Sequence, residues 1–281
     1  MQTITDLGEL RQRIGQWRLA GKRIGFVPTM GNLHAGHLSL VRLARERSDH
    51  VVASVFVNPT QFGPNEDYGR YPRTPDADMA GLRAAGCGLV WMPSVETMYP
   101  YGTDATVQVR VPGVTGLLEG AHRSGHFDGV ATVVTRLLNQ VQPELAVFGA
   151  KDYQQVAVIR YLVRDLAFAV EIATAATMRE ADGLAMSSRN QYLSGDERPV
   201  AAEIHRCLLW IRSQVQEGLP IAQVEAAAFR RLQDAGFAPD YVAIRTTDLA
   251  LPKPGHRGPL MALIAARLGS TRLIDNLEFL V

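Results

Sequence analysis

One local pattern occurs twice in this chain of 281 residues: a short apolar run, a turn with glycine, and then a stretch with helical periodicity. The first copy covers residues 23–47, with its turn at 28–37, and the second begins with the apolar run 145–148 and the turn 149–155. Buried parallel strands are typically continuous apolar runs, and glycine lets the backbone approach a ligand closely. The pattern predicts an α/β fold whose helix N-termini face a phosphate-containing ligand.

The first turn carries two imidazoles, His34 and His37. A ring N–H can donate to a developing oxyanion, so the pair could stabilise phosphate charge. Two alternatives stay open. A His-x-x-His pair on a helix could bind a metal, although the sequence has no Cys/His cluster nearby, or the pair could be purely structural.

Polar residues follow the other predicted strands. Asn58 and Gln61 come after the apolar run 50–57, where side chains at the carboxyl end of a central strand face ligands, although ordinary turn chemistry explains Asn58 equally well. In the second turn, Lys151 could hold a phosphate, and Gln155, one helical turn further on, would face the same crevice.

The stretch Met-Ser-Ser-Arg at 186–189 interrupts the helical and strand patterns. Two hydroxyls beside an arginine suit a phosphate clamp, but the serines fit a helix cap equally well. The Gly- and His-rich segment 118–129 is either a mobile surface loop or a substrate lid. Asp76 and Asp78 are interpreted as charges at a helix start.

Helical patterns at 199–217 and 221–235, followed by strand patterns, predict a smaller C-terminal α+β domain. We therefore expect a Rossmann-like parallel-sheet domain over 1–180 and an α+β lid domain over 181–281. Within the first domain, 106–111 is expected to form an exposed strand.

Composition places the chain among soluble globular proteins, with 47% hydrophobic and 20% charged residues. A net charge of +1 gives no electrostatic case for nucleic acid, and no apolar run reaches membrane-spanning length. The two cysteines, Cys87 and Cys207, lack metal-like spacing and are expected to be reduced. Charged residues near the N-terminus argue against a signal peptide, so we expect a cytoplasmic protein.

Four motifs together closely resemble the pantoate-beta-alanine ligase family. They are Pro-Thr-Met-Gly-Asn-Leu-His-Ala-Gly-His (28–37), Phe-Val-Asn-Pro-Thr-Gln-Phe (56–62), Gly-Ala-Lys-Asp-Tyr-Gln-Gln (149–155) and Asp-Gly-Leu-Ala-Met-Ser-Ser-Arg-Asn (182–190). The resemblance extends to Leu-Ile-Asp-Asn at 273–276. The first and last of the four motifs also resemble signatures of the wider nucleotidyltransferase superfamily.

The resemblance implies ATP-dependent condensation of (R)-pantoate with beta-alanine to pantothenate, by way of a pantoyl adenylate, with release of AMP and diphosphate. It implies catalytic roles for His37, His34 and Lys151. Pantoate would be bound by Gln61, Gln155 and Asn58, and beta-alanine by Gln61. The residues that it places around ATP are Met30, Gly31, Asn32, Leu33, His34, Ala35, Gly36, His37, Gly149, Ala150, Lys151, Asp152, Met178, Met186, Ser187, Ser188 and Arg189.

The resemblance further implies a homodimer and Mg²⁺ that arrives bound to ATP. Some relatives carry a fuller acidic cluster at 76–78, so no protein-held metal is expected here. Two other functions stay open. A related nucleotidyltransferase could move AMP onto a different acceptor, but it would not need Gln61 and Gln155 together. A non-catalytic nucleotide sensor would not need both histidines and Lys151.

Overall fold

The computed structural model describes residues 1–63 and 68–281 and divides into two compact units. The first unit comprises Met1–Ala150 and Val158–Ala176, and the second comprises Lys151–Ala157 and Thr177–Val281. The short segment Lys151–Ala157 therefore belongs to the second unit although both of its chain neighbours belong to the first. The predicted domain division at residue 180 stays a prediction.

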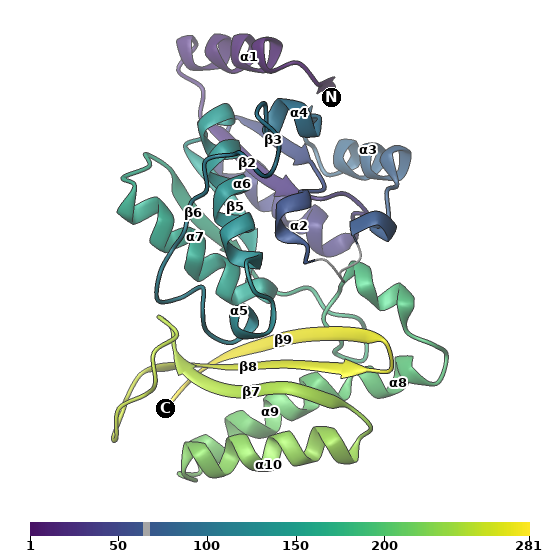
Figure 1. Cartoon of the computed structure of the whole chain (residues 1–281), viewed down its shortest axis with the longest axis vertical. Helices are drawn as coiled ribbons and strands as arrows, with labels where there is room; N and C mark the ends of the chain where they lie inside the picture. Colours follow the sequence, from purple (N-terminus) through teal and green to yellow (C-terminus); the bar gives the residue numbers. More distant parts are fainter. Residues whose placement is uncertain (64–67) are drawn as a thin grey trace. The chain divides into compact units, whose positions relative to one another are not determined.

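The first unit is built on a six-stranded parallel sheet with the strand order β1-β4-β3-β2-β5-β6. Figure 1 labels four of these strands, β2, β3, β5 and β6. The chain runs outward from β2 to β3 and β4 on one side, and from β5 to β6 on the other. The strand order therefore reverses between β2 and β5, which is where open α/β sheets bind ligands at the carboxyl ends of their strands. The strands are β1 (Gln2–Ile4), β2 (Ile24–Thr29), β3 (His50–Val55), β4 (Leu89–Trp91), β5 (Leu145–Gly149) and β6 (Glu171–Ala175).

Helices alternate with these strands along the chain, and their apolar faces pack on the sheet. Leu40, Val41 and Ala44 of α2, for example, form one core cluster with Val27 of β2 and Val147 of β5. The helices are α1 (Leu7–Leu19), α2 (Ala35–Arg47), α3 (Pro75–Ala84), α4 (Val95–Met98), α5 (Glu119–His122), α6 (His126–Val141) and α7 (Tyr153–Asp165). Single-turn 3₁₀ helices are η1 (Pro59–Gln61), η2 (Tyr68–Arg70) and η3 (Ala150–Asp152).

The prediction of a strand at 106–111 is wrong, since the structure has no helix or strand over these described residues. The N–H of Val109 donates instead to the hydroxyl of Thr132 on α6, at 2.9 Å. Val107 is 78% exposed. The alternating valines favour an extended backbone, but they form no strand because they pair with no other strand.

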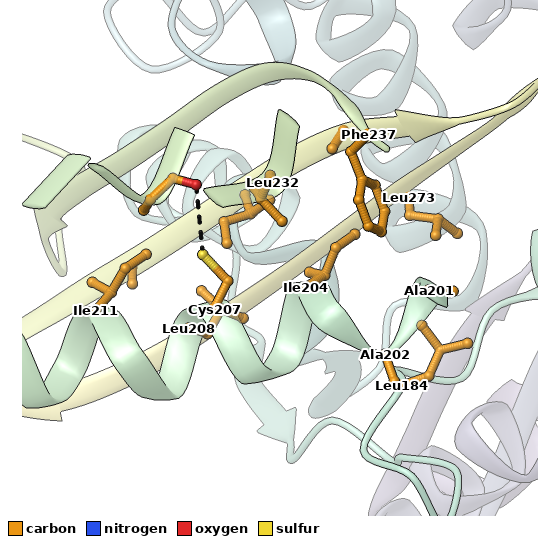
Figure 2. Close-up of a cluster of buried hydrophobic side chains, with 14 of the residues drawn as sticks. Leu184, Ala201, Ala202, Ile204, Cys207, Leu208, Ile211, Leu232, Phe237 and Leu273 are labelled. Carbon is orange, nitrogen blue, oxygen red and sulfur yellow. Dashed lines mark hydrogen bonds between the residues drawn. The ribbon is translucent and has the colours of Figure 1, made fainter. Parts of the chain in front are cut away.

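The second unit contains an antiparallel sheet in the order β7-β8-β9, together with α8 (Glu197–Ala201), α9 (Glu203–Gln216) and α10 (Ile221–Asp234). Its strands are β7 (Ala238–Thr246), β8 (Pro259–Leu268) and β9 (Thr271–Leu280), and η4 (Ser188–Tyr192) precedes the helices. Figure 2 shows its core, where Leu208 and Ile211 of α9 pack with Leu232 of α10 and Leu273 of β9. The α/β first unit and the α+β second unit confirm the predicted fold class.

Both cysteines are free and buried. Burial raises the pKa of the Cys207 thiol to about 12 and that of Cys87 to about 11, so both stay neutral. The Cys207 thiol lies 3.8 Å from the Ala228 carbonyl oxygen inside the second core (Figure 2). No helix among the described residues is long and apolar enough to cross a membrane.

Candidate active site

A buried carboxylate from α3 holds the turn that follows β2. Asp78 is 2% exposed, and it accepts the N–H groups of Asn32 at 3.0 Å and Leu33 at 2.8 Å. It also accepts the Thr74 hydroxyl at 3.1 Å. A Cβ atom on Gly31, whose φ is 84°, would lie 3.0 Å from Asp78 Oδ2, so glycine suits this close approach. Asp78 thus shapes a turn that is distant in sequence, a role that the sequence analysis did not predict.

The two histidines of this turn form a capping box at the N-terminus of α2. His34 Nδ1 accepts the Gly36 N–H at 3.1 Å, and His37 Nδ1 accepts the His34 N–H at 3.3 Å. Each Nδ1 is an acceptor, so in the neutral ring the hydrogen resides on Nε2. The ring centroids are 4.1 Å apart and both residues are half-buried. The pair therefore has the structural role that was left open, and it also carries two neighbouring Nε2–H donors.

The residues of this region do not resemble a protein-held metal site. The Asp78 carboxylate is already used by two backbone N–H groups and a hydroxyl. Among residues 1–63 and 68–281, no group of three or more His, Cys, Asp and Glu side chains is arranged to hold a metal ion. The expectation that Mg²⁺ arrives bound to ATP stays a prediction.

The Asn58 side chain lies after β3 and is 1% exposed. Its Nδ2 donates to the Gly129 carbonyl at 3.2 Å, and its Oδ1 accepts the Thr60 N–H at 3.3 Å. A carbonyl can only accept and an N–H can only donate, so these contacts fix which end of the amide is nitrogen. Oδ1 also accepts the Tyr99 hydroxyl at 2.6 Å. Burial raises the pKa of Tyr99, which keeps that hydroxyl protonated as a donor.

The orientation of Asn58 in turn fixes the amide of Gln61. Asn58 Nδ2 lies 3.2 Å from Gln61 Oε1, and Gln61 Nε2 lies 3.0 Å from the sulfur of Met30. Because Asn58 presents a donor, Gln61 must present its oxygen to Asn58 and turn its NH₂ group toward the end of β2. The turn-forming role of Asn58 is confirmed, because it caps η1.

The segment 118–129 packs against the same turn. His126 Nδ1 lies 2.8 Å from the Gln61 carbonyl oxygen, and His126 Nε2 lies 3.0 Å from an Arg123 guanidinium nitrogen. Since Arg can only donate, the neutral His126 ring donates from Nδ1 to Gln61. The segment contains α5 and the start of α6, and its contacts constrain the backbone beside Gln61.

In the second unit, Met178 and Met186 face each other across a short hairpin. The Met186 N–H donates to the Met178 carbonyl at 2.9 Å, and the Glu180 N–H donates to the Leu184 carbonyl at 2.8 Å. Ser187 caps η4 by accepting the Arg189 N–H at 3.2 Å. The cap alternative is therefore confirmed for Ser187, whereas its contact with phosphate stays a prediction.

The remaining predicted site residues follow β5. Gly149 ends that strand in the first unit, beside β2 in the sheet, and Ala150 follows it. Lys151, Asp152 and Gln155 belong to the second unit. The Lys151 ammonium lies 3.7 Å from the Asp152 carboxylate, and the lysine side chain is 19% exposed. The first unit thus groups the residues near β2 and β3, and the second unit holds the lysine, Gln155 and the hairpin.

Comparisons with known proteins give a consistent result. The family model described as pantoate-beta-alanine ligase matches residues 2–278. The chain is 61% identical to the pantothenate synthetase of Xanthomonas oryzae pv. oryzae (strain PXO99A), over 99% of this chain and 100% of that protein. It is similar to the crystal structure of pantothenate synthetase from Thermus thermophilus, with a TM-score of 0.92, 48% identity and 99% coverage of each chain.

A third similar structure is the pantoate-beta-alanine ligase of Francisella tularensis, which was crystallised with beta-gamma ATP and beta-alanine. Its TM-score is 0.83 and its identity 31%, over 99% of this chain and 97% of that one.

Proposed function

Because the chain belongs to the pantoate-beta-alanine ligase family, we infer that it condenses (R)-pantoate with beta-alanine to pantothenate, using ATP and releasing AMP and diphosphate. The roles proposed for individual residues rest on one observation: the hydrogen-bond donors that follow β2 and β3 have fixed orientations. The histidine Nε2–H groups suit phosphate oxygens, and the NH₂ group of Gln61 suits a carboxylate or hydroxyl oxygen.

In the first step, a carboxylate oxygen of pantoate attacks the α-phosphorus of ATP. A new O–P bond forms, the bond between the α- and β-phosphates breaks, and diphosphate leaves as pantoyl adenylate forms. We propose that His34, His37 and Lys151 donate hydrogen bonds to the phosphate oxygens, because an anionic nucleophile must approach a polyanion. Mg²⁺ that arrives with ATP would supply further neutralisation of phosphate charge.

In the second step, the amine of beta-alanine attacks the acyl carbon of the adenylate. The C–N bond forms, the acyl C–O bond to AMP breaks, and the amine proton is lost to solvent. We propose that Gln61, Gln155 and Asn58 orient the pantoyl group, and that Gln61 also contacts beta-alanine. The same amides also suit the first step. They can hold pantoate by hydrogen bonds without pairing its carboxylate in a salt bridge, so that the carboxylate remains nucleophilic toward ATP.

We propose that the 186–189 segment and the turn 149–152 surround ATP. We propose that the enzyme is a homodimer, as the resemblance described above implies, and that it acts in the cytoplasm. Sedimentation equilibrium tests the dimer directly, since one chain has a mass of 30.8 kDa.

The experiment that tests the proposed function is exchange of labelled pyrophosphate into ATP, with Mg²⁺ and without beta-alanine. Exchange that requires pantoate is the expected result, because it isolates formation of the acyl adenylate. Exchange with a different acid would identify a nucleotidyltransferase with another acceptor. No exchange with any acid, despite binding of ATP, would favour a nucleotide sensor.

A further inference from the structure

The consecutive residues Asp275 and Asn276 lie on β9, an edge strand of the second unit's sheet. Successive side chains of a strand point to opposite faces. Both residues are nevertheless buried, at 4% and 7% exposure. These polar side chains therefore meet the protein interior on both faces of the sheet, and such groups are costly unless they are paired.

Asp275 forms a bidentate ion pair with Arg179. The guanidinium nitrogens lie 2.6 and 3.0 Å from the two carboxylate oxygens. The same guanidinium donates to the Gly183 carbonyl at 3.0 Å. Since Arg179 and Gly183 belong to opposite arms of the hairpin that ends at Met186, Asp275 holds this hairpin to β9.

The hairpin also packs closely against α9. Gly183 has a φ of 95°, and a Cβ there would lie 2.6 Å from Cδ2 of His205 on α9. The Asp275 carboxylate also lies 3.9 Å from Nδ1 of that histidine. The position of the hairpin therefore depends on β9 and α9 together, and Ser187 to Arg189 follow the hairpin directly.

Asn276 reaches the other predicted phosphate-facing segment. Its Nδ2 donates to the Lys151 carbonyl at 2.7 Å, which identifies this atom as the nitrogen. Two residues later, the Tyr153 hydroxyl donates to the Thr247 carbonyl at 2.7 Å. The segment Lys151–Ala157 is thus attached at two places, to β9 beside Asp275 and to the turn that follows β7.

We propose that Asp275 and Asn276 are positioning residues that fix the Lys151 turn and the 186–189 segment relative to each other. Asn276 acts through the backbone of Lys151, and Asp275 acts through Arg179. The inference rests on the proposed function, because it is that function which places both segments against the phosphates of ATP. Charged and hydroxyl donors on two segments can contact one triphosphate only if their spacing is fixed, and a displacement of about 1 Å can lower a rate about 100-fold.

Two variants and one matched control test the inference. Asn276→Ala removes the bond to Lys151 and leaves the ion pair, whereas Asp275→Asn keeps the shape and weakens the ion pair. The control is Asp240→Asn, because Asp240 forms a 2.7 Å ion pair with Arg272 on the same sheet. Melting temperature and the KM for ATP in pantoate-dependent exchange are measured for each protein.

Asn276→Ala and Asp275→Asn are expected to raise the KM for ATP about tenfold or more. The control is expected to lower the melting temperature without changing that KM. Equal KM values in all three variants and the wild type would overturn the inference. If Asp275→Asn does not fold, Asn276→Ala alone decides, since it leaves the ion pair intact.

A double-mutant cycle separates a positioning role from general stability. The dissociation constant for Mg²⁺-ATP is measured by calorimetry for wild type, Asn276→Ala, Lys151→Ala and the double variant. If Asn276 acts through Lys151, its effect on ATP affinity disappears in the Lys151→Ala background, whereas independent effects multiply and contradict the inference. Because this readout is binding, it remains decisive even if the wild type shows no exchange and the proposed function fails.

Discussion

His37 illustrates how one side chain can serve both structure and chemistry. Its Nδ1 caps α2, and its Nε2–H is the donor proposed for phosphate. Glutamine at the third position of a helix can also accept the N-cap N–H, so His37→Gln separates the two roles. We expect this variant to keep its melting temperature and to lose pyrophosphate exchange about 100-fold.

The matched variant His37→Ala should lose the cap as well, at a cost of about 1 kcal/mol in the free energy of unfolding. Exchange at the wild-type rate in His37→Gln would show that the imidazole is only structural.

Gln61 is predicted to present a nitrogen, not an oxygen, to its ligand. Gln61→Glu can keep the oxygen that accepts from Asn58 and replaces only the NH₂ group with oxygen. A ligand acceptor would then face a carboxylate, so we expect the KM for pantoate to rise about tenfold or more, equivalent to about 1.4 kcal/mol. The control is Gln140→Glu, whose Oε1 likewise accepts a side-chain N–H, from Trp91 at 3.3 Å. An unchanged KM for pantoate in Gln61→Glu would contradict the assigned orientation.

His205 makes stability depend on pH. Burial, followed by the charge of Arg179, holds the pKa of this histidine below its usual value of 6.5, with Arg212 acting the same way and Asp275 opposing. Below pH 6.5 the unfolded chain binds a proton that the folded chain excludes, so stability falls as the pH is lowered.

We therefore expect the wild type to lose stability as the pH falls below about 6.5, with a slope of up to about 1.36 kcal/mol per pH unit from this group. In His205→Gln this component is absent, whereas in the exposed control His122→Gln it is retained. Urea denaturation across this pH range measures it, and parallel curves for wild type and His205→Gln would refute the assignment.

Residue types in the motifs predict candidate catalytic and binding side chains, but they do not identify the residues that hold those side chains in place. Asp78 holds a turn 46 residues away, Tyr99 meets Asn58 across 41 residues, and Asn276 meets Lys151 across 125. Such partners are set by the fold, and no spacing along the chain marks them. Only Asn276 lay inside a quoted motif, and that motif carried no predicted role.

At the scale of the element, α6 and η1 approach so closely that only glycine fits between them. A Cβ on Gly129 would lie 2.6 Å from the carbonyl carbon of Thr60 and 2.7 Å from Cα of Gln61. These are backbone atoms, so Gly129→Ala should lower the free energy of unfolding by about 1 to 3 kcal/mol and displace Gln61.

Gly15 supplies the control for that substitution, because it is also a helical glycine but a Cβ there meets nothing within 4 Å. Gly15→Ala is expected to raise stability by about 0.5–1 kcal/mol, the usual helix-propensity difference. Chemical denaturation measures both variants. Equal stabilisation by the two substitutions would show that α6 and η1 can separate without cost.

Element prediction succeeded where periodicity and burial agree. The apolar run at 145–148 is β5, and the helical pattern at 221–235 is α10 (Ile221–Asp234). It failed at 106–111, where the alternation indicates a strand but a strand requires a partner, and in the structure Thr132 takes the Val109 N–H. The three-residue strand β1 was not predicted either, because Gln2–Ile4 is too short to show a period.

At the scale of the whole molecule, the chain passes between the two units at three points, near residues 150, 157 and 176. A cut after Ala176 therefore leaves Lys151–Ala157 on the N-terminal fragment, although Asn276 on β9 bonds to Lys151 and Tyr153 bonds to Thr247 after β7. We expect a protein cleaved at an engineered protease site there to elute as one species in native size-exclusion chromatography and to separate in urea.

The control for this prediction carries Asn276→Ala and Tyr153→Phe. Each lost hydrogen bond is worth about 1 kcal/mol, so the fragments should separate at a lower urea concentration. Free fragments from the cleaved wild type under native conditions would contradict the assignment of Lys151–Ala157 to the second unit.

The sequence could not have revealed this interleaving. The turn 149–155 is one continuous motif, yet its first two residues group with one unit and the remainder with the other. Local patterns identify an element, but its grouping with other elements depends on contacts that are remote along the chain.

The three chain crossings have a consequence for how such a protein can change over generations. Neither unit corresponds to one uninterrupted stretch of coding sequence, so a single recombination event cannot exchange a complete unit between two genes. A crossover near codon 176 would combine Lys151–Ala157 from one parent with the β9 strand of the other. Chimeras of diverged parents should therefore survive only when both parents carry compatible residues at this junction.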